Sequence, residues 1–222
     1  RKAILDEVGR LWQEGRAVLL TGPTGTGKTE LLKHTVKKLY DGQRPEIVRC
    51  SEYVGAADVF GKHLLEATPE GGTKTKFMPG AYTRALDRDV PVIFDEMNLL
   101  EPKTRLQLKE FYNHRPGEKI LIQQDSGVEH TMGHGFRIAG TANVKSDKHK
   151  DRFELDAAET RVFAMPKVGY LPKEEMYDVL LSHPSVMDGR GQVHLTAEEA
   201  TETLKQLVEA ATLCVLIVFK MC

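Results

Sequence analysis

A glycine-rich segment followed by a lysine and a threonine is the strongest chemical signal in the sequence. It matches the pattern GxxxxGK followed by Ser or Thr, and its residues are Gly22, Pro23, Thr24, Gly25, Thr26, Gly27, Lys28 and Thr29. Glycines let backbone N–H groups turn around phosphates, and the N-terminus of a following helix adds a favourable dipole. Lys28 is expected to reach the β- and γ-phosphates, and the Thr29 hydroxyl to bind Mg²⁺. The segment therefore predicts a nucleotide phosphate-binding loop.

Two adjacent carboxylates, Asp95 and Glu96, directly follow the apolar run at residues 92–94. Open α/β sheets bind ligands at the carboxyl ends of their strands, so both acids are expected at such an edge. Asp95 is predicted to hold the Mg²⁺ that bridges the phosphates, and Glu96 to orient and deprotonate the attacking water. A solvated turn or helix cap is the alternative for an acidic pair taken alone. The phosphate loop favours the catalytic interpretation.

Two further polar residues lie beside apolar runs. Asn143 follows residues 136–142, where its amide could bind a water or a γ-phosphate oxygen without adding charge. A turn-forming asparagine is the alternative. Arg161 precedes residues 162–165, and its guanidinium would suit a developing phosphoryl charge. A surface ion pair is the alternative for this arginine.

Apolar runs that alternate with amphipathic stretches predict the elements that position these residues. Strands are expected at residues 17–21, 46–50, 90–94, 136–142 and 162–165, and helices at 1–14, at 28–40 and from Pro102. Repeated β-α units predict an α/β fold with a mainly parallel five-stranded sheet flanked by helices. Residues 51–88 are expected to be a helix interrupted by a Gly-Gly insertion, and residues 119–131 a hairpin.

The pattern changes after residue 171, where helical patterns follow one another without strands. A helix is expected to open at Pro172, and Thr196 with Glu199 predicts a capping box before another. We therefore expect an α/β nucleotide-binding core over residues 1–171 and a small helical lid over residues 172–222. The lid is expected to be incomplete. No initiator Met is present, so the chain is expected to begin inside a longer one or to have lost its first residues.

Composition limits the classes of partner and location. The 222 residues include 31 Lys plus Arg against 32 Asp plus Glu, for a formal net charge of -1. Such a balance argues against neutralisation of a nucleic-acid backbone as the main task. The longest apolar run, at residues 213–219, is short of the roughly 20 residues that span a bilayer. Three cysteines without CxxC spacing suggest neither a disulfide framework nor a zinc site, and favour the cytoplasm.

The order of these motifs resembles that of the AAA+ ATPases. More narrowly, it resembles the MoxR-like and dynein-related branch, whose members carry insertions in the second helix and before the sensor strand. The resemblance rests on residues 22–29, 92–98, 136–143 and 154–161, and it covers about residues 1–172. It implies a P-loop NTPase fold, ATP and Mg²⁺ as cofactors, and ATP hydrolysis that remodels or activates a protein client.

The resemblance also assigns roles to single residues. It makes Lys28 and Thr29 the Walker A pair, Asp95 and Glu96 the Walker B pair, Asn143 the sensor 1 residue and Arg161 the arginine finger. Arg152, which precedes a phenylalanine, competes with Arg161 for the last role. No sensor 2 arginine stands out in the lid, where only Arg190 occurs.

Partners follow from the resemblance alone. A finger that acts on the neighbouring subunit implies a ring, commonly a hexamer, and MoxR-like proteins often work with a von Willebrand A domain partner. Residues 74–79 and the hairpin around residues 125–127 would project toward the ring pore. Surface loops without a role in the pore are an equally good interpretation of these residues. A nucleic-acid-handling motor of helicase-like or restriction type is the alternative function, and a nucleotide-dependent scaffold is a third.

Two further clusters have simpler interpretations. The basic stretch at residues 145–152 could contact nucleic acid or phosphate, but a solvated charge run is the favoured interpretation. Among eight histidines, only His130 and His134 lie close together, and no third ligand accompanies them. We therefore expect no metal other than Mg²⁺.

Overall fold

The computed structural model describes residues 1–69, 71–143, 157–172 and 175 of the chain. By its internal contacts the chain divides into two compact units, Arg1–Gly169 and Tyr170–Cys222, and the first unit is described below. Nearly all of the expected lid lies outside the described residues, so its presence stays a prediction. Every helix in the described part of the chain is too short or too polar to cross a membrane.

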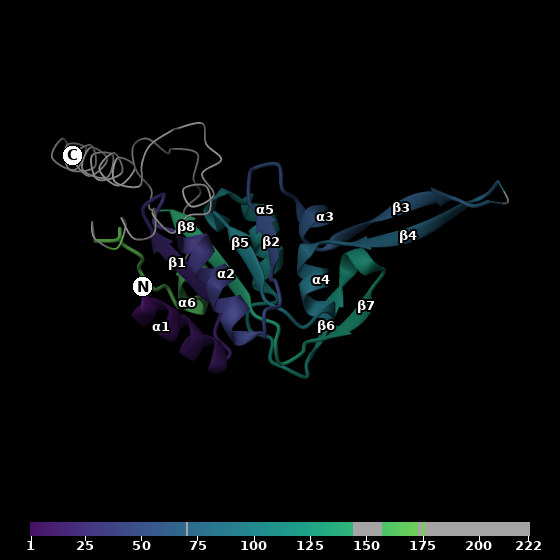
Figure 1. Ribbon diagram of the computed structural model, residues 1–222. Helices are drawn as coiled ribbons and strands as arrows, with labels where there is room; N and C mark the ends of the chain where they lie inside the picture. The colour runs from purple at the N-terminus through teal and green to yellow at the C-terminus, as the bar shows by residue number, and fades with distance from the viewer. Residues whose placement is uncertain (70, 144–156, 173–174, 176–222) are drawn as a thin grey trace, which may run out of the picture. The chain divides into compact units, whose positions relative to one another are not determined.

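Four parallel strands form the central sheet, in the order β1-β8-β5-β2 (Figure 1). Their bounds are Val18–Gly22 for β1, Glu46–Arg49 for β2, Val92–Asp95 for β5 and Ile138–Asn143 for β8. The expected α/β architecture with a mainly parallel sheet is thereby confirmed.

The sheet of the described residues has four strands rather than the expected five, and an extended segment that begins after residue 162 lies at the fifth position. Helix α6 (Ala157–Val162) continues to residue 162, so the chain becomes extended only after it. Ala164 and Lys167 then form isolated parallel bridges with Val18 and Thr21 of β1. The predicted strand was therefore offset by about two residues, because its first residue completes a helix.

Register brings the ends of three strands to one edge. Gly22 at the end of β1 lies opposite Asn143 at the end of β8. In the next pair, Phe94 of β5 lies opposite Gly140 of β8, which places Asp95 beside Thr141. The phosphate loop, the acidic pair and the asparagine are thus assembled at the carboxyl edge of the sheet, where α/β folds bind ligands.

Helices cover both faces of this sheet. Because successive strand residues point to opposite faces, Val18 and Leu20 pack in one apolar cluster and Leu19 in the other. The first cluster includes side chains from α1 (Lys2–Gln13) and α2 (Lys28–Leu39). The second includes side chains from α4 (Ala81–Asp87) and α5 (Pro102–Lys109). Near-continuous apolar strands are what a sheet buried on both faces requires.

Two hairpins interrupt the β-α pattern. After the short helix α3 (Ala56–Val59), strands β3 (Gly61–Ala67) and β4 (Thr73–Pro79) form an antiparallel hairpin that projects away from the sheet (Figure 1). Strands β6 (Lys119–Ile122) and β7 (Val128–Thr131) form the second, joined through the 3₁₀ turn η2 (Gln123–Asp125). The expected insertion and the expected second hairpin are both confirmed.

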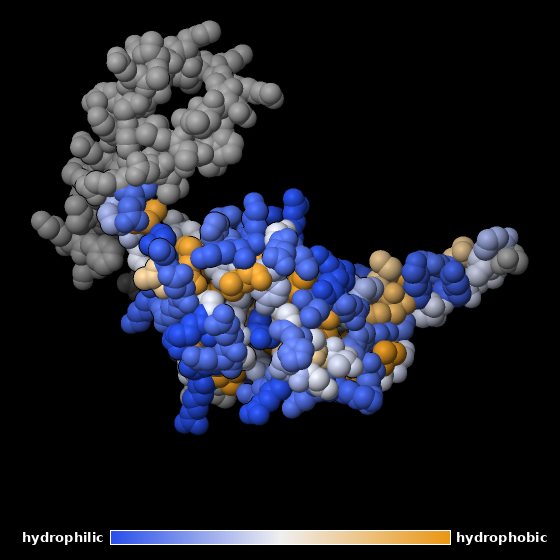
Figure 2. All heavy atoms as spheres, turned by 60° about the horizontal axis from the view of Figure 1, so that its bottom comes forward, coloured by the Kyte–Doolittle hydropathy of each residue, from blue (hydrophilic) through white to orange (hydrophobic). Residues whose placement is uncertain are grey.

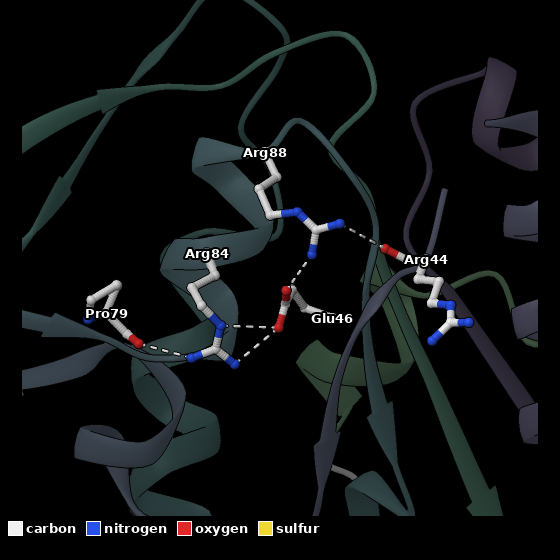
Figure 3. Close-up of polar contacts among 5 residues, drawn as sticks. All are labelled: Arg44, Glu46, Pro79, Arg84 and Arg88. Carbon is white, nitrogen blue, oxygen red and sulfur yellow. Dashed lines mark hydrogen bonds and ion pairs between the residues drawn. The ribbon is translucent and has the colours of Figure 1, made fainter. Parts of the chain in front are cut away.

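One carboxylate ties the edge strand β2 to helix α4 (Figure 3). Glu46 Oε2 accepts hydrogen bonds from Arg84 Nε and Nη2 at 3.1 and 2.9 Å, and Glu46 Oε1 accepts one from Arg88 Nη1 at 2.5 Å. Arg84 also donates to the carbonyl of Pro79, the last residue of β4, at 2.9 Å. The base of the projecting hairpin is therefore linked to the edge of the sheet through a single guanidinium.

A glycine is required where the phosphate loop leaves β1. The N–H of Val168 donates to the carbonyl of Thr21 at 2.7 Å, so a backbone segment runs directly beside Gly22. A Cβ on Gly22, whose φ is +154°, would lie 2.0 Å from the carbonyl oxygen of Val168. The segments around Gly22 and Val168 cannot move apart without loss of the hydrogen bond between Val168 and Thr21.

We expect Gly22→Ala to lower the free energy of unfolding by about 2 kcal/mol or more, because the methyl group meets backbone rather than a movable side chain. Urea unfolding of both proteins measures the difference. Gly9→Ala in helix α1 is the matched control, since its Cβ would meet only Leu39 Cδ1 at 3.7 Å and alanine favours a helix. Equal stability of Gly22→Ala and the parent would contradict the described packing.

Candidate nucleotide-binding site

The phosphate loop lies between β1 and α2, in the strand-loop-helix context that the motif requires. Gly25 and Gly27 have φ of +79° and +77°, which other residues rarely adopt. Gly27 is the N-cap of α2, which begins at Lys28. The first N–H groups of α2 have no partners within the helix, so this end of the site is suited to an anion.

The Lys28 side chain reaches back across the loop to the end of β8. Its ammonium donates to the carbonyls of Gly22 and Pro23 at 3.0 and 2.7 Å, and to Asn143 Oδ1 at 2.6 Å. Lys28 is only 6% exposed, so its charge is largely withdrawn from water. All three contacts are hydrogen bonds to oxygens, and phosphate oxygens could replace them on the same donor.

The Thr29 hydroxyl and the Asp95 carboxylate lie together, as the metal hypothesis requires. Thr29 Oγ1 donates to Asp95 Oδ1 at 2.5 Å, and Thr141 Oγ1 donates to the same oxygen at 2.8 Å. Hydroxyl, carboxylate and phosphate oxygens are the ligands that Mg²⁺ prefers. The donor set therefore fits Mg²⁺, with Thr29 and Asp95 as the residues that would hold it.

Glu96 has an unusual backbone. Its φ of 56° and ψ of 50° lie in the left-handed region, which costs a non-glycine residue about 1–3 kcal/mol. Its N–H donates to Thr141 Oγ1 at 2.9 Å, and this bond helps to hold the turn. The turn ends β5 immediately after Asp95, so the two adjacent carboxylates need not continue the strand's alternation. Strain of this kind, observed beside a pocket, is typical of functional residues.

Asn143 connects the two charged groups of the site. Its Oδ1 accepts from Lys28, and its Nδ2 donates to Glu96 Oε1 at 2.5 Å. Its own carbonyl accepts from Asn98 Nδ2 at 3.3 Å, inside the protein. A neutral amide thus spans the distance between the lysine and the glutamate. The sequence predicted an amide that binds a water or a γ-phosphate oxygen, which stays a prediction, and the structure gives this amide two side-chain partners.

A cavity of about 270 Å³ joins these groups. Its lining comes from the phosphate loop, from the start of α2 and from the ends of β5 and β8. The lining residues are Thr24, Gly25, Gly27, Lys28, Thr29, Glu30, Asp95, Glu96, Thr141 and Asn143. Most of the residues predicted from the sequence for binding and catalysis are therefore brought together in one hollow.

Three contributors to the site were missed at the level of the sequence. Thr141 lies two residues before Asn143 in β8, so period-two alternation could have indicated it. Asn98 follows the acidic pair and could have been noted as part of the same segment. Arg1 Nη2 donates to the carbonyl of Thr26 at 2.7 Å, a contact across 25 residues that no local pattern signals.

Arg161 lies apart from this cavity within the described residues. It is an exposed residue in the last turn of α6. Its competitor Arg152 lies outside the described residues, as do Arg190 and the basic stretch at 145–152. The choice between the two arginines therefore stays a prediction.

The cysteine and histidine side chains in the described part of the chain form no further reactive or metal centre. Cys50 is a buried free thiol. Burial, followed by the nearby charges of Asp95 and Glu96, raises its pKa, so it stays protonated. His130 lies 2.8 Å from Asp87 and 3.1 Å from Asp125. No group of three or more metal-binding side chains occurs among the described residues.

Comparisons with known proteins agree with this geometry. The family described as AAA domain (dynein-related subfamily) matches residues 17–163. The denitrification regulatory protein NirQ of Pseudomonas aeruginosa is 32% identical over 119 residues, which are 50% of this chain and 43% of NirQ. Protein NorQ of Paracoccus denitrificans is 30% identical over 126 residues, which are 57% of this chain and 43% of NorQ. The chain thus matches less than half the length of either protein.

A solved structure supports the fold independently. A candidate ATPase from Cytophaga hutchinsonii superposes with a TM-score of 0.61 at 17% identity. The superposition covers 92% of this chain and 57% of that one. At this level of identity the likeness shows a shared fold.

We expect Thr141→Val to lower the free energy of unfolding by about 1–3 kcal/mol, because it leaves the Glu96 N–H without its acceptor and removes one of the two hydroxyl donors to Asp95 Oδ1. Urea unfolding measures the change. Thr141→Ser keeps the hydroxyl and should retain most of the stability of the parent. Thr35→Val is a control of equal size, since Thr35 Oγ1 donates only to the Leu31 carbonyl within α2, at 2.9 Å. A Thr141→Val protein as stable as the Thr35→Val protein would show that the hydroxyl does not hold the turn.

Proposed function

The chain belongs to the dynein-related subfamily of AAA domains, and on that premise we propose that it binds ATP with Mg²⁺ and hydrolyses ATP to ADP and phosphate. One observation carries the proposal: the contacts from Thr29 to Asp95 and from Lys28 through Asn143 to Glu96 converge on a single cavity. Binding groups and a candidate base would therefore lie within reach of the same phosphates.

Binding is proposed to rest on residues 22–29 and on Asp95. The glycine-rich backbone would surround the phosphates, and Lys28 would donate to β- and γ-phosphate oxygens in place of its present carbonyl partners. Thr29 and Asp95 would hold Mg²⁺, which supplies positive charge that neutralises the phosphates when bound.

Hydrolysis is proposed to use Glu96 as the general base. The carboxylate would accept a proton from a water as the water oxygen bonds to the γ-phosphorus and the bond to the bridging oxygen breaks. Asn143 lies within hydrogen-bonding distance of both Glu96 and Lys28, so it is suited to position this carboxylate. Lys28 would stabilise the charge that develops on the phosphoryl oxygens.

Arg161 is proposed to complete the site of a neighbouring subunit. It is exposed and lies in a different element from those that form the cavity. A guanidinium in such a place can serve a second copy of the chain without rearrangement of its own site. The proposal implies a ring, which we expect to be a hexamer, of chains with a nucleotide-binding core at residues 1–171 and a helical lid at residues 172–222.

The energy of hydrolysis is proposed to remodel or activate a protein client in the cytoplasm. The name of NirQ describes it as a regulatory protein. By analogy, the client of this chain would be another protein, such as a von Willebrand A domain protein. The β3-β4 hairpin is suited to contact it. By strand alternation, His63, Leu65 and Phe77 share one face, which carries no Lys, Arg, Asp or Glu, and Leu65 is 75% exposed. Lys74 and Lys76 pair with Glu66 on the other face.

Glu96→Gln is expected to bind ATP as the parent does and to hydrolyse it about 10²–10⁴-fold more slowly, because glutamine has the same shape and cannot accept the proton. Phosphate release and nucleotide affinity are measured on the same protein. Glu110→Gln, an exposed residue after α5, is the control and should hydrolyse ATP normally. Unchanged turnover in Glu96→Gln would remove the proposed mechanism.

Two inactive variants are expected to complement each other if Arg161 acts between subunits. Arg161→Ala alone should lose about 10³-fold in turnover, as loss of an arginine finger does. Mixed with Glu96→Gln, it should regain activity, because some sites then combine an intact Glu96 with an intact Arg161. Arg10→Ala at an exposed site of α1 is the control. A mixture no more active than its two components would place the arginine outside its neighbour's site.

A further inference from the structure

A second hollow lies at the end of the sheet opposite the phosphate loop. It has a volume of about 570 Å³ and is formed by the end of α1, the start of β1, the segment after α5 and the segment between β7 and β8. Figure 2 turns the bottom of Figure 1 forward and shows that hydrophilic residues cover much of this side of the molecule. A neighbouring hollow of about 350 Å³ shares Gln13, His134 and Arg137 with it. The two together form a continuous lining around Arg137.

The lining carries an excess of positive charge. Arg16, Arg115 and Arg137 contribute three guanidiniums, and Glu14 is the one carboxylate among the lining residues. Glu14 is already paired with Arg10 at 2.6 Å. Among the described residues, none of the three lining arginines forms an ion pair with a carboxylate. The hollow therefore combines concave shape with uncompensated cationic groups.

Arg137 is held in place by backbone carbonyls. Its Nε donates to the carbonyl of Trp12 at 2.7 Å, and its Nη1 donates to the carbonyl of Phe136 at 2.6 Å. These neutral acceptors fix the plane of the guanidinium without cancelling its charge. A fixed guanidinium is a preorganised donor for phosphate or carboxylate oxygens.

Two buried polar atoms of the lining have no partner in the described part of the chain. Trp12 is 2% exposed and lines the smaller hollow, and its indole N–H has no acceptor. His114 lines the larger hollow, and its Nδ1 is buried and also without a partner. Buried polar atoms in folded proteins are almost always hydrogen-bonded. A bound molecule with oxygen atoms would supply the hydrogen-bond partners that these two nitrogens lack.

We propose that this hollow binds a phosphorylated small molecule with two or more negative charges. Three guanidiniums match such a charge, and the volume lies in the range of small-molecule sites, roughly 300–1,000 Å³. The site is distinct from the nucleotide site, since Lys28 and the phosphate loop lie at the other end of the strands. The assignment goes beyond ATP hydrolysis and gives the chain a second anion site, suited to regulation.

Trp12 is the single tryptophan of the chain and reports directly on this site. Pyrophosphate is titrated into the Lys28→Ala protein, whose phosphate loop has lost its cation, and tryptophan fluorescence is followed. We expect a saturable change, and we expect it again in the parent protein with its loop filled by a non-hydrolysable ATP analogue. Removal of two exposed lining charges, Arg16→Gln with Arg115→Gln, should weaken pyrophosphate binding about tenfold or more.

A matched control removes the same charge elsewhere. Lys37→Gln with Lys62→Gln changes two exposed lysines of α2 and β3 and should leave the pyrophosphate affinity within about twofold of the parent. Thermal midpoints without ligand show whether each double variant is folded, and a rise in midpoint with pyrophosphate gives a second measure of binding.

Three outcomes would overturn the assignment. The first is a fluorescence change that does not saturate, and the second is an equal loss of affinity in the two double variants. The third is tighter binding of a hexaglutamate peptide than of pyrophosphate, which would assign the hollow to an acidic protein segment instead. None of these outcomes bears on ATP hydrolysis, which is tested at Glu96.

Discussion

The parallel pairing of β1 with β8 is the constraint on which the site depends. Because Gly22 lies opposite Asn143, the phosphate loop and the polar end of β8 start from the same level of the sheet. A shift by one residue would turn Asn143 and Thr141 to the other face, since side chains alternate along a strand. The shift would also bring a residue with a side chain to the place of Gly140, where a Cβ would lie 2.8 Å from Leu19 Cδ1, so the core itself resists it. Hydrophobic packing therefore fixes the geometry of a polar site.

At this edge of the sheet, neutral side chains form hydrogen bonds with the charged groups of the site. The Lys28 ammonium and the Glu96 carboxylate each contact Asn143, and an amide can donate to one and accept from the other. In a direct ion pair, the lysine and glutamate charges would compensate each other. The intervening amide keeps each group hydrogen-bonded while leaving its charge for a ligand. Thr141 serves Asp95 and the Glu96 backbone in the same way, with one hydroxyl that donates and accepts.

Local sequence patterns predicted most of the fold and much of the site. The phosphate loop, the acidic pair and both insertions depend on short-range signals, namely glycine spacing, apolar runs and turn residues. The offset near residue 162 arose because an apolar run does not distinguish the last turn of a helix from the first residues of a strand. The left-handed Glu96 and the double role of Thr141 depend on the register of β8 against β5. That register results from packing between residues about 45 positions apart, which no local pattern contains.

The bonds around Glu46 also have a mechanical meaning. Arg84 joins the last residue of the projecting hairpin to Glu46, and Glu46 belongs to the edge strand β2. Strand β2 pairs along its length with β5, so that Arg49 lies opposite Asp95. A pull on the tip of the hairpin would therefore load an unbroken path of hydrogen bonds that ends one strand away from the phosphates. The hairpin could in this way transmit force from its tip to the strand that carries Asp95.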